Sequence, residues 1–415
     1  MCQYDFVVGR RLMDGLRLGC YNDEASRITG SLASHAKGHS MTIIRSAVLL
    51  TFTASLVAGC KPTTAPTGTS PTGAEPTVTV APPAPEPDDA KSIAGLEEIG
   101  AKLKKDGDGL VIEADFRGLT VGDSALEHLA GLPRLRSVLL NETGVTDAGM
   151  ATVGKVATLQ NVDLRGCTIS NAGLEPLAAL SELKALRLSG ESGATLVDDD
   201  GMKHVAKMKN LKALLLDFLW ISEAGLEQLA GLDKLEELYL AKTLVGDDAL
   251  ATMSQFPRLK KLRVSQCQFE NDGLAHLAKV TTLEDLDLSE NNQINDLGMP
   301  HLSDLKQLKR LNLWRTYVGD PGVENLAGLA AMEWLNLDNS QISDDCLKHL
   351  SGMSKLSFLH LGSTLVSDAG LPALKGLSSL KDLKVTRTAV TEEGVAELKK
   401  SLPDTEIQLR YIAGQ

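Results

Sequence analysis

One pattern of leucines recurs about every 24 residues along most of this chain, and this regularity limits the fold more than any other feature of the sequence. Successive copies start 24 residues apart, except for 28 residues after Leu183 and 25 after Leu283, and a weaker copy near Val111 brings the number of units to twelve. The other units start at Leu135, Leu159, Leu183, Leu211, Leu235, Leu259, Leu283, Leu308, Met332, Leu356 and Leu380. A period of roughly 20–50 residues is typical of a solenoid, in which each unit contacts only its neighbours.

Each unit has an apolar face that it cannot bury alone. In its opening L-x-x-L-x-L segment the fourth and sixth residues, such as Leu238 and Leu240, point to the same side of an extended chain. A later segment carries apolar residues at helical spacing, as at Leu226, Leu229 and Leu232. Aromatic residues make up only 4% of the chain, so we expect an aliphatic core shared between stacked units.

A small polar residue lies three positions after the last leucine of the extended segment. The residues at this position include Thr143, Cys167, Thr243, Cys267, Thr316, Ser340, Thr364 and Thr388. We interpret them as a ladder that satisfies buried backbone groups, so Cys167 and Cys267 are predicted to be structural rather than redox residues. The following hydroxyl and carboxylate, as in Ser367-Asp368, are predicted to cap a helix.

The L-x-x-L-x-L pattern resembles that of leucine-rich repeats, and the Cys or Thr after the strand with a D-x-G-L helix start resembles the cysteine-containing, ribonuclease-inhibitor-like subclass. The resemblance implies an α/β horseshoe solenoid, with a parallel β-sheet on the concave face and short helices on the convex face. We place the repeats at 111–403. Within 91–110, the segment from Ile93 to Lys104 is predicted to form an N-terminal capping helix, and within 404–415 the segment TEIQLR, 405–410, is predicted to add a closing strand.

An apolar run ends in a cysteine well before the repeats begin. Arg45 is the one charge in residues 42–59, and the run closes with LVAGC at Cys60. A basic start, an apolar segment and small residues are typical of a secretory signal, and LVAGC resembles the lipobox of bacterial lipoproteins. That resemblance implies a signal peptide over 41–59, lipidation of Cys60, and an exported, membrane-anchored protein of the cell envelope, periplasmic or surface-exposed. The alternatives are an uncleaved membrane anchor or a buried helix.

Two further segments flank this signal. Residues 1–40 show no periodicity, and Met41 begins a signal of ordinary length, so we interpret 1–40 as a spurious or disordered extension. Residues 60–90 are rich in Pro, Thr, Ala and Gly with few large apolar side chains, so they cannot bury enough surface to offset their ordering entropy. We predict that 60–90 is a tether.

Charge and motifs narrow the function. A net charge of −12 and a pI near 5.2 argue against nucleic-acid binding, which needs clustered Lys and Arg. The sequence has no H-E-x-x-H, G-x-S-x-G or P-loop motif, so we predict a non-enzymatic protein with no cofactor and no metal.

Residues 191–200 carry Glu191, Asp198, Asp199 and Asp200. A calcium site is an alternative there, but the spacing favours a solvated loop that leads into a helix.

Exposed positions of the strands bring aromatic and charged residues together on the predicted concave face. Stacking in register places Arg310, Trp334 and Phe358 in one column, with Trp314, Asn336 and His360 beside it. Exposed aromatic and Arg side chains are typical of interface anchors, so we predict that a monomer binds a protein or glycan here.

Three alternatives stay open. The aromatic residues are scattered surface residues, or the repeats are a structural spacer of the cell envelope. The third is a substrate-recognition subunit of a ubiquitin ligase, a class that shares the repeat type. The export signal and the lack of an adaptor-binding domain oppose it.

Overall fold

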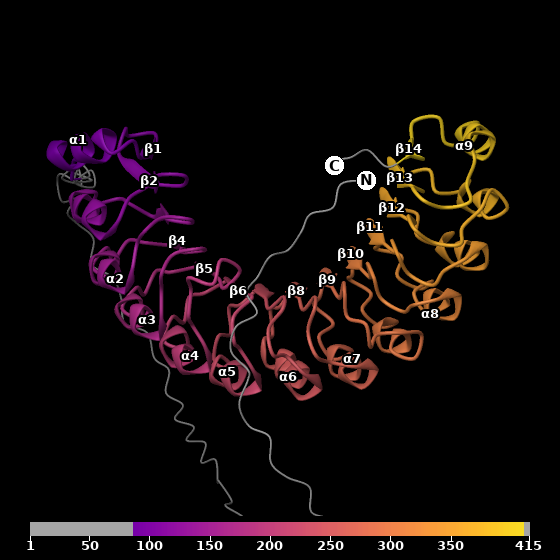
Figure 1. The fold of residues 1–415 in the computed structure, drawn as a ribbon, viewed down its shortest axis with the longest axis horizontal. Coiled ribbons are helices and arrows are strands. Elements are labelled where there is room, and N and C mark those ends of the chain that lie inside the picture. The colour runs from indigo at the N-terminus through magenta and orange to yellow at the C-terminus, as the bar shows by residue number, and fades with distance from the viewer. Residues whose placement is uncertain (1–85, 411–415) are drawn as a thin grey trace, which may run out of the picture. The chain divides into compact units, whose positions relative to one another are not determined.

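The computed structural model describes residues 86–410, which form one curved solenoid (Figure 1). The predicted segments 1–40 and 41–59, the lipidation residue Cys60 and most of the tether lie outside the described residues. Within residues 86–410, fourteen strands form one open sheet in the order of the sequence, β1 to β14. The sheet lines the concave face and the helices cover the convex face (Figure 1), as the repeat pattern predicts.

The strands are short, and the twelve strands from β2 to β13 correspond to the twelve repeat units. The strands are β1 (Lys102–Lys105), β2 (Val111–Asp115), β3 (Ser137–Leu139), β4 (Asn161–Asp163), β5 (Ala185–Ser189), β6 (Ala213–Asp217), β7 (Glu237–Tyr239), β8 (Lys261–Arg263), β9 (Asp285–Asp287), β10 (Arg310–Asn312), β11 (Trp334–Asn336), β12 (Phe358–His360), β13 (Asp382–Lys384) and β14 (Glu406–Gln408).

The convex segments are short α-helices in most units and 3-10 helices in the others. The α-helices are α1 (Ala90–Glu98), α2 (Asp147–Val153), α3 (Asn171–Leu177), α4 (Asp199–Val205), α5 (Glu223–Gln228), α6 (Asp247–Thr252), α7 (Asn271–Leu277), α8 (Asp320–Glu324) and α9 (Glu392–Lys399). The 3-10 helices are η1 (Asp123–Gly131), η2 (Met253–Gln255), η3 (Met299–Leu302), η4 (Asp344–Leu350) and η5 (Leu371–Leu374).

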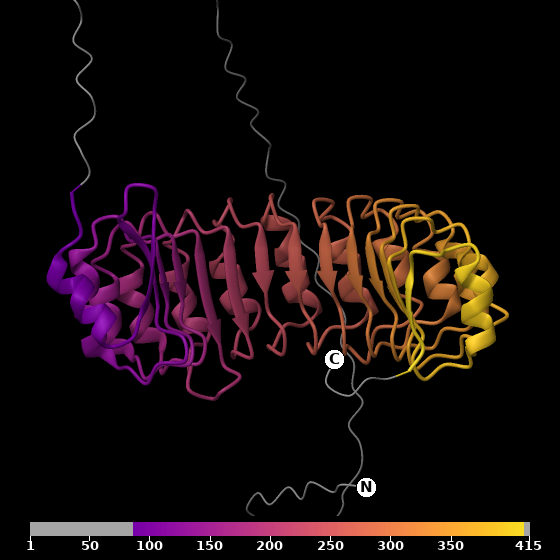
Figure 2. The same cartoon turned by 90° about the horizontal axis from the view of Figure 1, so that it is seen from above.

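The N-terminal end differs from the prediction of one helix from Ile93 to Lys104. Helix α1 ends at Glu98, and Gly100 then adopts a left-handed φ of 84° that turns the chain back. Lys102–Lys105 forms β1, which pairs antiparallel with β2. Figure 2 shows the strands side by side along the solenoid, with the N-terminal end in indigo. All later neighbours are parallel, and β14 extends the sheet from β13 within the segment 405–410. The hairpin thus covers the edge of β2 that the first repeat would leave open.

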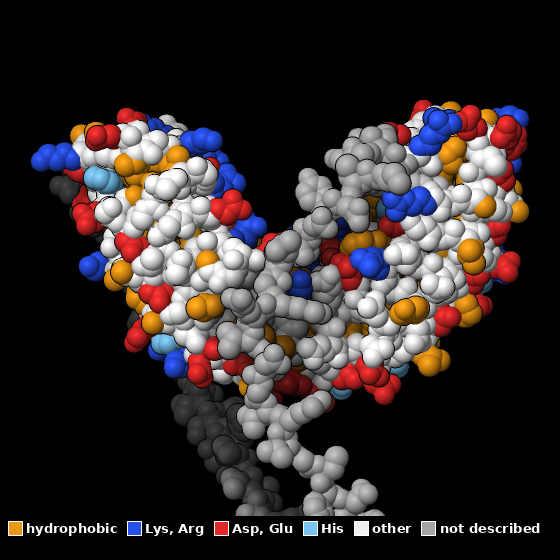
Figure 3. Space-filling view, in the orientation of Figure 1, with side chains coloured by type: hydrophobic (Ala, Val, Ile, Leu, Met, Phe, Trp, Pro, Cys, Tyr) orange, Lys and Arg blue, Asp and Glu red, His pale blue; other side chains and the backbone are white. Residues whose placement is uncertain are grey.

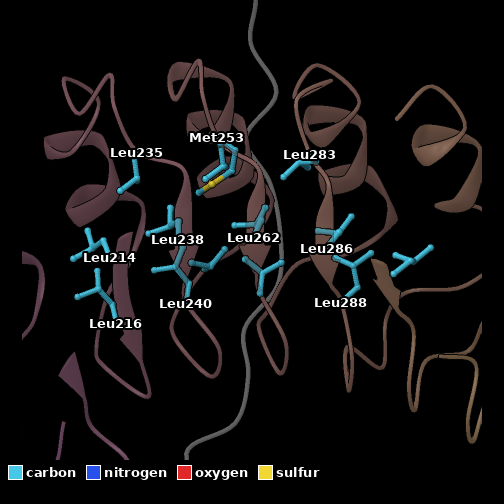
Figure 4. Packing of buried hydrophobic residues seen from close by; sticks show 14 of the residues in the cluster. Leu214, Leu216, Leu235, Leu238, Leu240, Met253, Leu262, Leu283, Leu286 and Leu288 are labelled. Carbon is cyan, nitrogen blue, oxygen red and sulfur yellow. The ribbon is translucent and has the colours of Figure 1, made fainter. Parts of the chain in front are cut away.

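The core is one continuous aliphatic layer between the sheet and the helices. Leu238 of β7 and Leu240 just after it are fully buried, as are Leu226, Leu229 and Leu232. Figure 4 shows leucines of neighbouring units side by side in this layer. Burying a leucine side chain contributes about 1.5–3 kcal/mol relative to leaving it exposed. Because each unit supplies only part of this layer, the units stabilise one another.

A left-handed residue follows each strand in most units. Nine of the residues 86–410 with positive φ are not glycine, including Phe218, Lys242 and Arg315. This conformation turns the backbone N–H toward the next unit. The N–H of Lys242 donates to the carbonyl of Ser265 at 2.8 Å, and that of Arg315 to Asp338 at 3.0 Å. The row of left-handed residues therefore continues the inter-unit bonding past the end of the sheet.

The predicted ladder of small polar residues is confirmed. Thr143 Oγ1 donates to the carbonyl of Leu140 at 2.6 Å, and Cys167 Sγ donates to the same oxygen at 3.0 Å. Burial raises the pKa of the Cys167 thiol, which disfavours a reactive thiolate. Asn291, which occupies this position in the 25-residue unit, was not predicted from the sequence. Its Nδ2 donates to the carbonyls of Val264 and Leu288, and its Oδ1 accepts from the Cys267 N–H at 2.7 Å.

The hydroxyl and the carboxylate at the helix start have different roles. Ser170 Oγ accepts from the Ala172 N–H at 3.2 Å and caps its own helix α3, as predicted. Ser367 Oγ makes the same bond to the Ala369 N–H, but in the turn before η5, whose N-cap position is Gly370. Asp368 instead accepts from the N–H and the hydroxyl of Thr391, in the next unit, at 2.8 and 2.6 Å. The prediction that the carboxylate caps its own helix is wrong here. Pairs joined in this way, acceptor first, are Asp123 with Thr146, Asp147 with Ser170, Asp199 with Ser222, Asp320 with Ser343, Asp344 with Ser367 and Asp368 with Thr391.

Two of the acidic residues in the segment 191–200 form the helix-cap and inter-unit hydrogen bonds just described. Asp198 caps α4 by accepting from the Asp200 N–H at 3.0 Å, and Asp199 bonds to Ser222 of the next unit. Among residues 86–410, no group of three or more His, Cys, Asp or Glu is placed to hold a metal ion. In the same range, no helix has the length and apolar character needed to cross a membrane.

Candidate functional site

Parallel pairing in a 24-residue register brings equivalent residues of successive units side by side. Arg310 of β10 pairs with Trp334 of β11, and Trp334 pairs with Phe358 of β12. Asn336 and His360 pair two residues further along the same strands. Arg310, Trp334 and Phe358 therefore lie side by side, as their places in the repeat predict. With a constant repeat length and parallel strands, residues at the same position of successive units become neighbours in the sheet.

The column is a stack of alternating contacts rather than a set of separate side chains. The rings of Trp334 and Phe358 are stacked, with centroids 4.9 Å apart and an angle of 7° between their planes. The Arg310 guanidinium lies over the Trp334 ring at 4.5 Å from its centroid, and the Lys384 ammonium lies 5.5 Å from the Phe358 centroid. We call Arg310, Trp334, Phe358 and Lys384 the concave column.

Strand order shows that both cations lie at the ends of this stack. Arg310 comes from β10 and Lys384 from β13, whereas the rings lie on β11 and β12 between them. Each ring thus has its aromatic partner on one face and a cation on the other. Cation–π contacts of this kind contribute about 0.5–1 kcal/mol at exposed sites and about 2 when desolvated. The rings are half-buried, so part of each stays accessible on the concave side.

Acidic residues continue the row on either side. Asp285 of β9 pairs with Arg310, and its Oδ2 lies 3.2 Å from Nε of that guanidinium. Asp382 of β13 stands beside Phe358 in the register. Burial raises the pKa of Asp285, and Arg310 partly opposes this shift. Asp285 and Lys384 were not predicted from the sequence. Asp285 occupies the third position of its unit, the same position as Arg310, Trp334 and Phe358. Lys384 occupies the fifth position and reaches Phe358 diagonally, so a comparison of equivalent positions alone does not reveal this contact.

His360 lies next to the column in a shielded position. Its ring meets that of Phe358 edge-on, with centroids 6.3 Å apart. Burial lowers the pKa of His360, and the Asp338 carboxylate, 3.9 Å from Nε2, opposes the shift without reversing it. The nearby Lys384 also lowers this pKa. His360 is therefore a neutral hydrogen-bonding group at neutral pH rather than a third cation beside Arg310 and Lys384.

Trp314 and Asn336 have more local roles than the prediction gave them. The Arg315 guanidinium lies over the Trp314 ring at 5.4 Å and also bonds to Glu290. Trp314 thus forms its own cation–π pair beyond the end of β10. Asn336 Oδ1 accepts from the Asp338 N–H at 3.0 Å and holds the turn after β11. Its amide nitrogen is the part of that side chain left to face a partner.

A hollow of about 510 Å³ lies on the concave side, apart from the concave column and nearer the N-terminal half. Tyr239, Arg263 and Asp217 are among the residues that line it. Arg263 bonds to Asp217 at 3.1 Å, so the cation is matched by a carboxylate within the site. Burial raises the pKa of Asp217, and Arg263 opposes the shift. On the visible face in Figure 3, acidic and basic side chains are intermixed. Neither the hollow nor this face therefore has a strong electrostatic potential of one sign that would attract a highly charged ligand.

Comparison with known proteins identifies the repeat and the fold. The model of the leucine-rich-repeat family matches residues 157–178 and 280–299. A leucine-rich-repeat protein of Leptospira interrogans is 19% identical, with a TM-score of 0.51 over 68% of this chain and 68% of that one. An internalin of Listeria monocytogenes is 20% identical, with a TM-score of 0.49 over 71% of this chain and 94% of that one. No curated protein matches the sequence. The chain therefore folds as a leucine-rich-repeat solenoid.

Proposed function

We propose that this leucine-rich-repeat solenoid is a binding protein that holds a protein partner on its concave column. Proteins with this repeat commonly bind other proteins, and an open concave sheet offers a surface that the fold itself does not use. The single observation that carries the proposal is the stack of Arg310, Trp334, Phe358 and Lys384, where the sheet presents aromatic rings and cations to the concave side. Residues of these types dominate the energy of protein interfaces.

The same stack favours a protein over a glycan. A sugar ring packs against the open face of an aromatic ring. Both faces of Trp334 and of Phe358 already have partners: each other, Arg310 and Lys384. The edges of the rings and the outward N–H groups of the cations are left. Carboxylates and carbonyls of a polypeptide match those donors, and apolar side chains match the ring edges. Asp382 at one end of the row favours a basic group of the partner there, whereas Asp285 at the other end already pairs with Arg310.

Site-specific photo-crosslinking in the cells that produce the protein tests this proposal before the partner has been identified. A photoreactive amino acid replaces Asp382, which stands beside Phe358, and in a second variant it replaces Glu324, an exposed residue of the convex helix α8. We expect a discrete adduct from position 382 that protease digests, and none of the same size from position 324.

Removing the aromatic anchors provides the matched control. Trp334→Ala together with Phe358→Ala should eliminate the adduct from position 382, because truncating an interface anchor costs about 2 kcal/mol or more, which is roughly thirtyfold in affinity. Identical adducts from both positions, or an adduct that persists without the two rings, contradict the proposal. An adduct that resists protease and is degraded by a glycosidase assigns the face to a glycan instead.

Anchoring at a membrane is a separate part of the proposal and rests on the sequence. The segment LVAGC supports export and lipidation of Cys60, and the ladder residues Cys167 and Cys267 support the narrower cysteine-containing repeat subclass. Labelled fatty acid should be incorporated by the full chain and not by Cys60→Ala. Equal incorporation by both contradicts lipidation at Cys60. A purified protein whose N-terminus lies upstream of Cys60 indicates an uncleaved anchor instead.

A further inference from the structure

A strip of exposed apolar side chains lies outside the concave column, on the edge of the solenoid where the chain leaves the strands. Leu196, Trp220 and Leu244 occupy equivalent places in three consecutive units, and 64%, 69% and 38% of their surfaces are exposed. The next units on either side carry Thr168 and Gln268 at this place. An apolar strip that begins and ends at polar residues is a local feature, and strips of this kind mark interaction sites.

Phe218 adds a second aromatic ring beside this strip at a conformational cost. Its φ is 62°, in the left-handed region that bulky side chains rarely adopt. The bond made there, from the Phe218 N–H to the carbonyl of Ala241 at 2.7 Å, is a backbone bond that any residue can make. The phenyl ring is half-exposed and is not part of the buried core. Eight other non-glycine residues of the described range adopt the same conformation, so the turn belongs to the repeat, but the fold does not require a phenyl ring there.

The four extra residues of the unit from Leu183 complete the site. This insertion carries Gly190, where an added Cβ would lie 2.1 Å from the carbonyl oxygen of Phe218. Only glycine allows the inserted loop to approach so closely. The result is a hollow of about 400 Å³ whose lining includes Phe218, Trp220 and Leu244. We call Leu196, Phe218, Trp220 and Leu244 the insert-side patch.

One cation stands at the rim of this hollow. The ammonium of Lys242 lies 5.2 Å from the centroid of the Phe218 ring. Among residues 86–410 no carboxylate lies within ion-pair distance of it, whereas Lys212, Lys261 and Lys309 each pair with a glutamate of a neighbouring unit. Glu191 of the inserted loop also lines the hollow. The apolar floor and the unpaired ammonium beside Phe218 together define the chemistry of the occupant on that side of the hollow.

We propose that the insert-side patch docks an extended protein segment that places an apolar side chain against Phe218 and Trp220 and a carboxylate against Lys242. The site is separate from the concave column, so its occupancy does not depend on the function proposed for that face. A volume of about 400 Å³ accommodates one or two side chains, and the rim residues Gln266 and Gln268 supply donors and acceptors for the backbone of the segment.

Selection of peptides from a random phage-display library on the full chain tests the proposal. We expect enriched peptides that combine a large apolar residue with a neighbouring Asp or Glu. Their affinity should fall at least about tenfold with Trp220→Gln and with Lys242→Gln, as expected for interface anchors. Leu365→Gln is the matched control, because Leu365 occupies the equivalent place in a distant unit and is 74% exposed. It should leave the affinity unchanged.

Phe218→Gly separates binding from folding. Glycine adopts positive φ freely, so this variant should keep or raise the melting temperature while it weakens peptide binding at least about tenfold. Three outcomes of the peptide selection overturn the proposal: no enriched peptide, peptides that bind Trp220→Gln as well as the parent chain, or enriched peptides with basic rather than acidic residues. A dimer in sedimentation experiments that Trp220→Gln dissociates also overturns it, because the occupant is then a second copy.

Discussion

The glycine two residues after the Asp or Asn that begins the convex helix allows one unit to bond to the next, and Gly173→Ala tests this directly. A Cβ at position 173 would lie 2.2 Å from Oδ1 of Asp147 in the preceding unit. That carboxylate accepts the backbone N–H of Ser170 at 2.8 Å and its hydroxyl through the other oxygen. The methyl group therefore displaces the carboxylate, and Ser170 loses its inter-unit partner.

The size of the effect follows from two opposing contributions. Hydrogen bonds to a charged group contribute about 1.5–3 kcal/mol each, and for this partly buried pair we take a total loss of about 3 kcal/mol. Alanine is about 1 kcal/mol better than glycine inside a helix, and position 173 lies in α3. Gly173→Ala should thus lower the free energy of unfolding by about 2 kcal/mol.

Asp147→Ala reverses the sign of that substitution. Alone it should cost about 3 kcal/mol, because the same bonds are lost. In that background no carboxylate opposes the new methyl group, and the nearest remaining atom is Cγ2 of Ile169 at 3.1 Å, which needs only a small shift. Gly173→Ala should then raise stability by about 1 kcal/mol. The two changes are coupled by about 3 kcal/mol in a double-mutant cycle.

Equilibrium urea unfolding of the four proteins measures this cycle. The chain contains a natural control in another pair of units, where Ala249 stands at the place of Gly173 and Glu223 stands at the place of Asp147. Among the described residues, the Glu223 side chain forms no hydrogen bond to the next unit. Ala249→Gly should cost about 1 kcal/mol through helix propensity alone. The reasoning is refuted if Gly173→Ala has the same effect with and without Asp147.

Other residues give predictions of the same kind. Asn291→Ala should lower the free energy of unfolding by more than Ser340→Ala, by about 1–3 kcal/mol, because it leaves three buried backbone groups unpaired rather than one; urea unfolding of both measures it. The fold lowers the pKa of His360, so as pH falls below about 6.5 the unfolded chain binds a proton at this residue before the folded chain does. The free energy of unfolding therefore decreases until the pH reaches the pKa of His360 in the fold. His360→Gln should reduce this decrease in unfolding curves measured between about pH 7 and about pH 5. Burial raises the pKa of the Cys346 and Cys167 thiols, so both should react with a thiol reagent only after denaturant is added. Labelling of either residue in the native protein contradicts their burial.

The sequence predicted the fold and three of the four residues of the concave column, because both follow from the repeat. Once the period is known, parallel register makes residues at equal positions neighbours, so Arg310, Trp334 and Phe358 are placed together without a structure. Features that break the repeat were missed. The β1 hairpin occurs once and has no second copy to reveal it. Lys384 reaches its ring diagonally, and contact across positions depends on side-chain length and rotamer.

The role of the helix-start aspartate was missed for another reason. A carboxylate next to a helix start is predicted to cap that helix, because capping is a local interaction. In this chain a bond 23 residues away replaces it, as between Asp368 and Thr391. The glycine at the same place in the next unit was the available signal, because the missing side chain of Gly394 leaves room for the Asp368 carboxylate. Phe218 was missed because its unusual φ is set by its place in the turn and not by its own preference.

Hydroxyl-radical footprinting of the full chain, free and with the partner captured at position 382, tests the central claim most directly. The claim is that the concave column is the surface on which a protein binds. The oxidation rates of Trp334 and Phe358 should fall in the complex, whereas that of Tyr317, which is 57% exposed on the edge of the solenoid, should not change. Unchanged rates at Trp334 and Phe358, with protection elsewhere, contradict the account.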